Sequence, residues 1–501
     1  MASTFGGLSI AKSALNAAQI GLSTTTNNMS NIDTAGYSRQ VVNQTSIGPA
    51  AVYSSSLVGN GVSVDSVERV RSFRLDQKYW QENSAASEWE VQSAYLEQIE
   101  TVFGSTDSSD ISTALDSFNT ALESLSTDTG SSSARAVVLE AANEFCTTLN
   151  DASSQLTQLR SDINSDVKTA VDQINSYATQ IAALNKQISV ANASGSSANE
   201  LQDQRDVLID ELSGLVGVTV AEGDNGIYNI TIKGKSLVNG SSANELECYT
   251  NTDSSSDAYS MYGIRWADSG ETFDSGDTGA LNGYLDLRDG NGADNMGIPY
   301  YSSQLDDFAR TFAQSFNEGI TSGTTTYSGH ADGMGLDGTT GVRFFSYDSL
   351  SSAELMATGA DNAAVYANIT AANISVSQDI QDDTDKIATA STDGEEGNNE
   401  NIGDIISICG SAAISGNATV DDLYSAIVST VAAASAFAQT EYDRKDTIAT
   451  YIDTSRSSVS GVSSDEETVN LTVYQSAYEA SASMVSTWSE IYQTTINMVD
   501  D

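Results

Sequence analysis

Apolar and small residues recur in a coiled-coil spacing at both ends of the chain. Near each end they follow one another at alternating intervals of three and four residues, which predicts one amphipathic helix ending near residue 32 and another over 464–501. The N-terminal stripe comprises Leu8, Ala11, Leu15, Ala18, Leu22, Thr25, Met29 and Ile32, and the C-terminal stripe comprises Val473, Ala477, Ala480, Met484, Thr487, Ile491, Thr494 and Met498.

The C-terminal helix has a second apolar stripe, so it needs more than one neighbour. Both main stripes are poor in large side chains, each of which contributes about 1.5–3 kcal/mol when fully buried. Ordering the backbone costs about 1–2 kcal/mol per residue. We therefore expect the two ends to be loose in the monomer and to become ordered when stacked on other copies of the chain. The second stripe comprises Tyr474, Tyr478, Val485, Trp488 and Tyr492.

The middle of the chain changes its period twice. Helical spacing dominates 73–213, and its longest stripe begins at Val138 and ends at Ile188, with one stutter between Ile163 and Val167. The alternation around an Asp-Asn-Gly turn at 224–226 then predicts a β-hairpin, followed by a β-rich stretch. Helical spacing returns near 305–316 and over 423–459, with loops predicted at 321–341 and 389–401.

These elements predict an α+β multidomain fold in which the terminal helices pair as a coiled coil, beside a long helical bundle with an inserted β-rich domain. We predict four units. Residues 1–72 with 464–501 form the terminal assembly domain, and 73–215 with 300–320 and 420–463 form the bundle. Residues 216–299 form a β-rich outer domain, and 321–419 form a loop-rich region that returns to the bundle.

An Asn-rich turn follows the first helix. Asn, Asp and Gly favour helix ends and left-handed backbone, so a helix stop with a bend near Gly36 is the simplest interpretation. The turn also resembles the Asn-Asn-x-x-Asn-x-x-Thr-Pro-Gly-Tyr signature of the bacterial flagellar rod, hook and hook-associated axial proteins, with Ala35 in place of the usual Pro. The positions that match are Asn28, Asn31, Gly36 and Tyr37.

Further runs narrow the resemblance to the members of that family that join hook to filament. They are 38–40, 61–64 with Arg69 and Arg71 behind them, and, at the other end, 460–467 and 474–480. The resemblance implies a structural protein whose terminal helices assemble into a tube or ring, with the bundle outside it. The assembly interface would comprise Leu8, Leu15, Leu22, Met29, Ile32, Val473, Ala477, Ala480, Met484, Ile491 and Met498.

The resemblance also implies partners and a location. The partners are other copies of the chain, the flagellar hook protein, hook-associated protein 3 and an export chaperone on the C-terminal helix. Export by the flagellar type III system without a cleaved signal peptide would place the protein outside the cell, in the flagellum. Two alternatives stay open: another axial protein of hook, rod or flagellin type, and, from a different class, an enzyme or a surface adhesin whose central domain binds a glycan.

Charge narrows the possible partners. The 501 residues contain 68 Asp and Glu against 21 Lys and Arg, which gives a net charge of −47. Such a surface repels nucleic acid and anionic membranes, and we identify no stretch apolar enough to span a membrane. Cys146, Cys248 and Cys409 are far apart in the sequence, so neither a zinc knuckle nor a disulfide framework is indicated.

No motif predicts catalysis, a cofactor or a metal. The 333–338 segment has the Gly-x-Gly-x-x-Gly spacing but lacks the strand and helix that build a nucleotide site. Lys235 resembles a P-loop lysine without the upstream glycine, and 289–293 fails as a calcium loop. His330 is the only histidine, and we expect a solvated loop residue there. The chain is therefore predicted not to be an enzyme.

Overall fold

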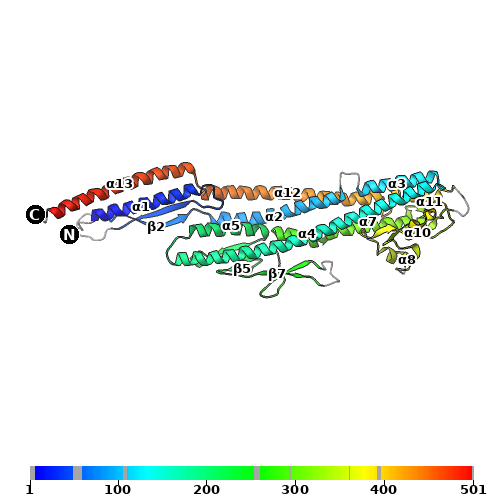
Figure 1. The fold of residues 1–501 in the computed structure, drawn as a ribbon, viewed down its shortest axis with the longest axis horizontal. Coiled ribbons are helices and arrows are strands. Elements are labelled where there is room, and N and C mark those ends of the chain that lie inside the picture. Colours follow the sequence, from blue (N-terminus) through cyan, green and yellow to red (C-terminus); the bar gives the residue numbers. More distant parts are fainter. Residues whose placement is uncertain are drawn as a thin grey trace.

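The computed structural model describes residues 6–48, 59–104, 110–252, 260–292, 295–359, 361–391 and 397–498. The molecule is elongated, and its first and last helices lie together at one end (Figure 1). This terminal part consists of α1 (Gly6–Ser30), the antiparallel pair β1 (Gln40–Ser46) and β2 (Val62–Arg69), and α13 (Ser464–Asn497). The predicted α+β fold with paired terminal helices is confirmed.

The body is built along one very long helix. It contains α2 (Phe73–Phe103), α3 (Ile111–Thr127), α4 (Ser132–Ala193), α5 (Asn199–Leu215), α7 (Ile298–Glu318) and α12 (Val420–Ser460). Ser131 caps α4, which has 62 residues and so extends for about 90 Å at 1.5 Å per residue. The predicted apolar stripe of α4 is buried, except that Tyr177 and Leu184 are only partly covered.

The predicted stutter in α4 marks the border between two hydrophobic cores. Ile163 is the last α4 residue in the first core, which gathers α3, α7, α11 (Glu400–Gly410) and the start of α12. Val167 is the first α4 residue in the second core, which gathers α5 and the central strands. The stutter rotates the apolar stripe, so that each half of the helix faces its own partners.

The central strands cover the second half of α4. β3 (Thr219–Glu222), β4 (Tyr228–Ile232), β5 (Lys235–Asn239) and β6 (Ser242–Ala243) form an antiparallel sheet in that order, and β7 (Leu246–Thr250) pairs with β8 (Tyr262–Trp266). The predicted hairpin is β3–β4, with Asn225 at φ 56° in the turn. Lys235 begins β5 after a tight turn, as expected from a strand lysine.

Two stretches differ from the sequence-based expectation. The predicted β-rich segment contains a helix, α6 (Ala280–Asp289), which packs against α2 and α4. The region 321–419 is also less open than predicted, because Ile374, Val376 and Ile402 from it are fully buried in the first core. Its short elements are β11 (Ile320–Ser322), β12 (Thr325–Tyr327), β13 (Phe345–Tyr347), α8 (Ser352–Met356), α9 (Asn362–Tyr366), β14 (Ile374–Val376), α10 (Gln378–Asp382) and α11.

One stretch departs from the expectation about membranes. Within 420–497 the structure contains a helical window that is long and apolar enough to cross a membrane by length and composition. A helix that packs in a bundle passes the same test, and α12 packs along α2.

Candidate assembly interface

The two terminal helices pair side by side and antiparallel (Figure 1). Two aromatic rings of α13 seat on two glycines of α1. A Cβ atom at Gly7 would lie 2.2 Å from the Trp488 ring, and one at Gly21 would lie 2.5 Å from the Tyr474 ring. Both pairs are spaced by fourteen residues, which is two heptads. A side chain at either position would force the ring to move, so glycine permits this close approach.

The pair uses the second stripe of α13, not the main one. Tyr474, Trp488 and Tyr492 are half-buried, and Ser481 between them is buried. The predicted seam lies one residue earlier at each step, so it is rotated by about 100° on the helix. It therefore faces solvent: the exposed fraction is 58% at Val473, 48% at Met484 and 75% at Met498. Ala477, Ala480 and Ile491 are exposed as well.

On α1 the predicted stripe faces its neighbours. Ala11, Ala18 and Thr25 are buried, and Leu8, Leu15, Leu22 and Met29 are half-buried. α1 lies between α13 and the β1–β2 hairpin, where the Ser13 hydroxyl accepts a hydrogen bond from the Val62 amide at 3.2 Å. Ile32 differs from its expected place, because it follows the end of α1 in a turn and is 41% exposed.

Asn28 of the signature turn closes the loop that follows α1. Its side-chain amide donates to the carbonyl of Gln40 at 2.9 Å, and its Oδ1 accepts from the amide of Gln40 at 3.0 Å and from the Tyr37 hydroxyl at 2.8 Å. The side chain thus pairs with both backbone groups of the first residue of β1. Asn28 is 1% exposed, so water cannot replace these partners.

The other signature residues shape the same loop. Asn31 bonds the carbonyl of Asn27 at 3.0 Å, and Gly36 has φ 77°, where a Cβ atom would lie 2.1 Å from Val207 of α5. Burial and the nearby Glu200, with two further acids, raise the pKa of Tyr37 to about 12, so its hydroxyl stays a donor. The turn therefore fixes how the chain leaves α1.

Replacing Asn28 by alanine should cost about 2–4 kcal/mol, because the buried amide and carbonyl of Gln40 lose their partners. Hydrogen exchange of residues 31–46 should accelerate accordingly. Asn31→Ala is the matched control, since Asn31 is half-exposed and water can replace its partners. Equal protection of 31–46 in wild type and Asn28→Ala would contradict this role.

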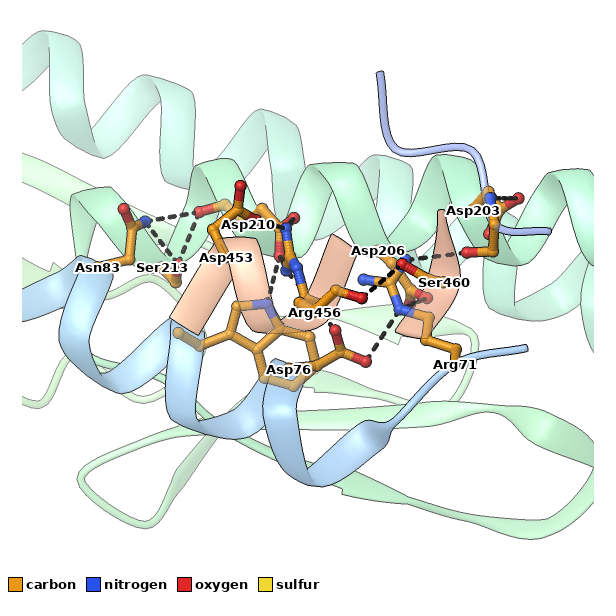
Figure 2. A network of polar contacts seen from close by, with 12 residues as sticks. Arg71, Asp76, Asn83, Asp203, Asp206, Asp210, Ser213, Asp453, Arg456 and Ser460 are labelled. Carbon is orange, nitrogen blue, oxygen red and sulfur yellow. Dashed lines mark hydrogen bonds and ion pairs between the residues drawn. The ribbon is translucent and has the colours of Figure 1, made fainter. Parts of the chain in front are cut away.

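A buried ion-pair network joins the terminal part to the body, and we call it the joint (Figure 2). Its acidic side is one face of α5, formed by Asp203, Asp206 and Asp210. Arg69 contacts Asp203 and Asp206, each at 2.7 Å. Arg456 of α12 makes a bidentate pair with Asp210 at 2.9 and 2.8 Å. The remaining members are Arg71, Asp76 and Trp80, whose indole donates to Asp210.

Hydrogen bonds at the joint hold the segment that precedes β1 and the C-terminal end of α12, which connect the terminal part to the body. The amide of Ser38 donates to Asp203 at 3.0 Å, and the amide of Arg39 donates to the carbonyl of Ser460 at 2.7 Å. Arg39 also pairs with Glu466 in the first turn of α13 at 2.8 Å. Burial lowers the pKa of Arg71, but Asp206 and Asp76 outweigh it and the net pKa is raised. The arginine charges are thereby held in place.

The residues considered for chemistry do not form a site. His330 is 1% exposed, which corrects the expectation of a solvated loop residue. Its Nδ1 bonds the carbonyl of Val342 at 2.7 Å, and its Nε2 accepts from the amide of Ala388 at 2.9 Å. The 333–338 segment follows a single 3₁₀ turn rather than a strand. Within the described ranges, no group of acids, cysteines and histidine is arranged to hold a metal ion.

Known proteins resemble the chain over its whole length. It is 32% identical to flagellar hook-associated protein 1 of Bacillus subtilis over 99% of each chain. The chain belongs to the flagellar hook-associated protein 1 family. It is a structural component of the flagellum, as its family is. The protein of the same name from Escherichia coli is 28% identical over 97% of this chain and 98% of its own.

Family models match three separate parts of the chain. Residues 96–345 match the model described as flagellar hook-associated protein FlgK helical domain. Residues 8–37 match flagella basal body rod protein, and 455–498 match flagellar basal body rod FlgEFG protein C-terminal. The hook junction protein FlgK from Burkholderia pseudomallei has a similar solved structure at 29% identity and TM-score 0.46, covering 55% of this chain and 47% of that one. The segments shared with rod proteins are thus α1 with its signature turn, and α13.

Neither Gly7 and Gly21 nor the joint was predicted from the sequence. The equal fourteen-residue spacing of Gly7 to Gly21 and of Tyr474 to Trp488 was a readable signal for the register. The pairings of the joint gave no such signal, because Arg69 and Arg456 each lie more than a hundred residues from the acids of α5 that they contact. Only the presence of Arg69 and Arg71 in a run that resembles the family pointed to this segment.

Proposed function

We propose that this chain joins the flagellar hook to the filament, by self-assembly of its terminal helices into a ring or tube. The exposed apolar stripe of α13 carries this proposal. It lies on the side of α13 that α1 leaves open, at the end of the molecule where the two terminal helices lie together (Figure 1). Contiguous apolar surface of this kind marks an interaction site.

The distribution of exposed apolar side chains supports the proposal. In the part of the chain that the structure describes, seven of the 18 exposed large apolar residues lie between Val469 and Met498. That segment carries only two charged residues, Glu479 and Glu490. A chain of net charge −47 repels its own copies, so contacts between copies favour surface of this composition. The proposed assembly residues remain those of the two predicted stripes.

Partners and export belong to the same proposal. One face of the ring would contact the hook protein and the other hook-associated protein 3. Before export by the flagellar type III system, a chaperone would cover the stripe of α13. The chain would act mechanically, without catalysis. We expect the terminal helices of the isolated chain to exchange hydrogen faster than the body, because α13 buries only Glu467 and Ser481 fully.

The open alternatives receive less support. Relatives of hook-associated protein 1 match the whole chain, whereas the rod-protein models match only its two ends. No feature of the described residues favours an adhesin.

The proposal is tested by placing charge on the stripe. Cells lacking the native protein and carrying Val473→Asp/Met484→Asp should make hooks without filaments and shed flagellin into the medium. Burying even one carboxylate against an apolar partner costs several kcal/mol, and each 1.4 kcal/mol is tenfold in affinity. Electron microscopy of the cells and flagellin in the culture medium give the readout.

The matched control adds the same charge to another face of α13. Gln475 and Ser486 are exposed and lie outside both stripes, so Gln475→Asp/Ser486→Asp should keep filaments. Both variants should give the helical circular dichroism of wild type. Normal filaments in Val473→Asp/Met484→Asp cells would reject the proposal.

A further inference from the structure

One long stretch of the body carries no charge at all. Residues 423–440 of α12 contain neither acid nor base, in a chain with 68 acidic residues. One face of this stretch is used within the molecule, where Tyr424, Ile427 and Val431 are buried in the first core. The opposite face is exposed at Ser425, Ala433 and Phe437. The lack of charge on a solvent face is unexplained by the packing of the chain itself.

The exposed face borders a groove between α2, α6 and α12. The groove has a volume of about 770 Å³, and its apolar wall includes Trp89, Leu96, Met296, Ala434 and Phe437. Phe437 is 58% exposed, although its ring stands edge-on to Trp89 with 5.5 Å between the ring centres. A large aromatic side chain held in place and left half-covered is typical of an interface anchor.

The acids that line the groove are shielded. Glu88 shares the side-chain amide of Asn282 with Asp286, at 3.2 and 3.1 Å, and Asp286 also accepts from Asn295 at 2.9 Å. Burial raises the pKa of Glu88 to about 7, with Asn282 opposing the shift and Asp286 adding to it. Burial likewise raises the pKa of Asp286. The raised pKa values reduce the negative charge that these two acids contribute to the groove.

We propose that the groove between α2 and α12 receives the body of a second copy of this chain. Two copies of net charge −47 approach each other at least cost through surface without charge, and charged residues are depleted in interface centres. The groove also lies on α12, the helix that leads directly into α13 with its exposed stripe (Figure 1). A membrane is a poorer occupant, since the buried half of 423–440 cannot leave the core.

This inference rests on the proposed self-assembly and adds a second contact between copies. At the helical rise of 1.5 Å per residue, the groove lies about 40 Å along the molecule from the stripe of α13. The inference is tested in flagella of cells whose only copy of the full chain carries the photo-crosslinking residue p-benzoylphenylalanine in place of Phe437. Irradiation should give a product of twice the chain mass, in which mass spectrometry finds residue 437 joined to another copy. The product should disappear in the Val473→Asp/Met484→Asp background.

A charge variant gives an independent readout. Phe437→Glu should reduce the proportion of cells with filaments at least tenfold, while the purified chain stays folded with the helical circular dichroism of wild type. Thr450→Glu, at an exposed residue of α12 outside the groove, should have no effect on filaments.

Three results would overturn the inference. Crosslinks from residue 437 could form only within the chain or to a different protein, while Val473→Asp/Met484→Asp still abolishes filaments; the proposed function would then stand without the groove contact. Phe437→Glu could leave filaments unchanged. The purified chain could bind phosphatidylcholine vesicles and lose that binding in Phe437→Glu, which would assign the face to a membrane.

Discussion

Arg456→Met should lower the free energy of unfolding by about 3–5 kcal/mol, because it leaves Asp210 buried without its bidentate cation and removes one of the two arginines near Asp76. Arg456 bonds both oxygens of Asp210 and lies 3.6 Å from Asp76. Its guanidinium also stacks over the Tyr79 ring at 4.1 Å. Urea unfolding gives the energy, and hydrogen exchange of 199–215 and 445–460 should show where protection is lost.

The loss should be smaller at low pH. Burial raises the pKa of Asp210, and Arg456 opposes the shift. Without Arg456 the pKa rises further, so the carboxyl takes up a proton and the uncompensated charge disappears as the pH falls. In Arg456→Met the carboxyl of Asp210 is therefore protonated at a higher pH than in wild type, so the difference in stability between the two should narrow as the pH falls.

Two controls separate the joint from a general effect of losing an arginine. Arg444 lies on the same helix and pairs with Glu441 at the surface, so Arg444→Met should change stability by no more than about 0.5 kcal/mol. Asp210→Asn added to Arg456→Met should cost less than the two single changes together, by about 1–3 kcal/mol. Equal urea midpoints for Arg456→Met and Arg444→Met would contradict the assignment.

His330 should titrate far below an ordinary histidine. Burial lowers its pKa to about 4, the bond to Val342 opposes the shift, and Arg135 adds to it. The imidazole of His330 takes up a proton near pH 6.5 in the unfolded chain but only near pH 4 in the folded chain. Stability contributed by the neutral ring is therefore complete above pH 6.5 and is lost as the pH falls toward 4, by up to about 3 kcal/mol.

The measurement is direct because the chain has one histidine. A ¹⁵N-histidine sample should show one imidazole that remains neutral at pH 5, with the proton on Nδ1, since Nε2 accepts the amide of Ala388. His330→Gln should remove this part of the acid dependence of unfolding between pH 6.5 and 4. An imidazole that titrates near pH 6.5 would mean that His330 is solvated after all.

Long periodic elements could be predicted because one physical signal repeats along them. The α4 stripe repeats over most of a 62-residue helix, and its single predicted stutter between Ile163 and Val167 coincides with the change of core that the structure shows. The β3–β4 hairpin was equally readable, because the turn at 224–226 supplies the left-handed residues that the chain needs there. α6 was missed, since ten residues with Gly283 among them give too few turns to show a period.

The site was harder to predict than the fold. The main stripe of α13 is more regular than the stripe that pairs with α1. The pattern alone therefore could not predict which of these two stripes would pack against Gly7 and Gly21. His330 is buried by backbone groups at Val342 and Ala388, and backbone groups leave no mark in a sequence. The joint depends on charges that meet only after α5 and α12 have packed.

The pairing of α1 with α13 makes the packing of one terminal helix depend on the presence of the other. Residues 6–30 have their helical partner in 464–497, which lies several hundred residues further along the chain. A chain that lacks 464–497 after premature termination or proteolysis has no helix to pack against Gly7 and Gly21 of α1. It also lacks the exposed apolar stripe of α13. Under the proposed function, such a chain would not enter the assembly.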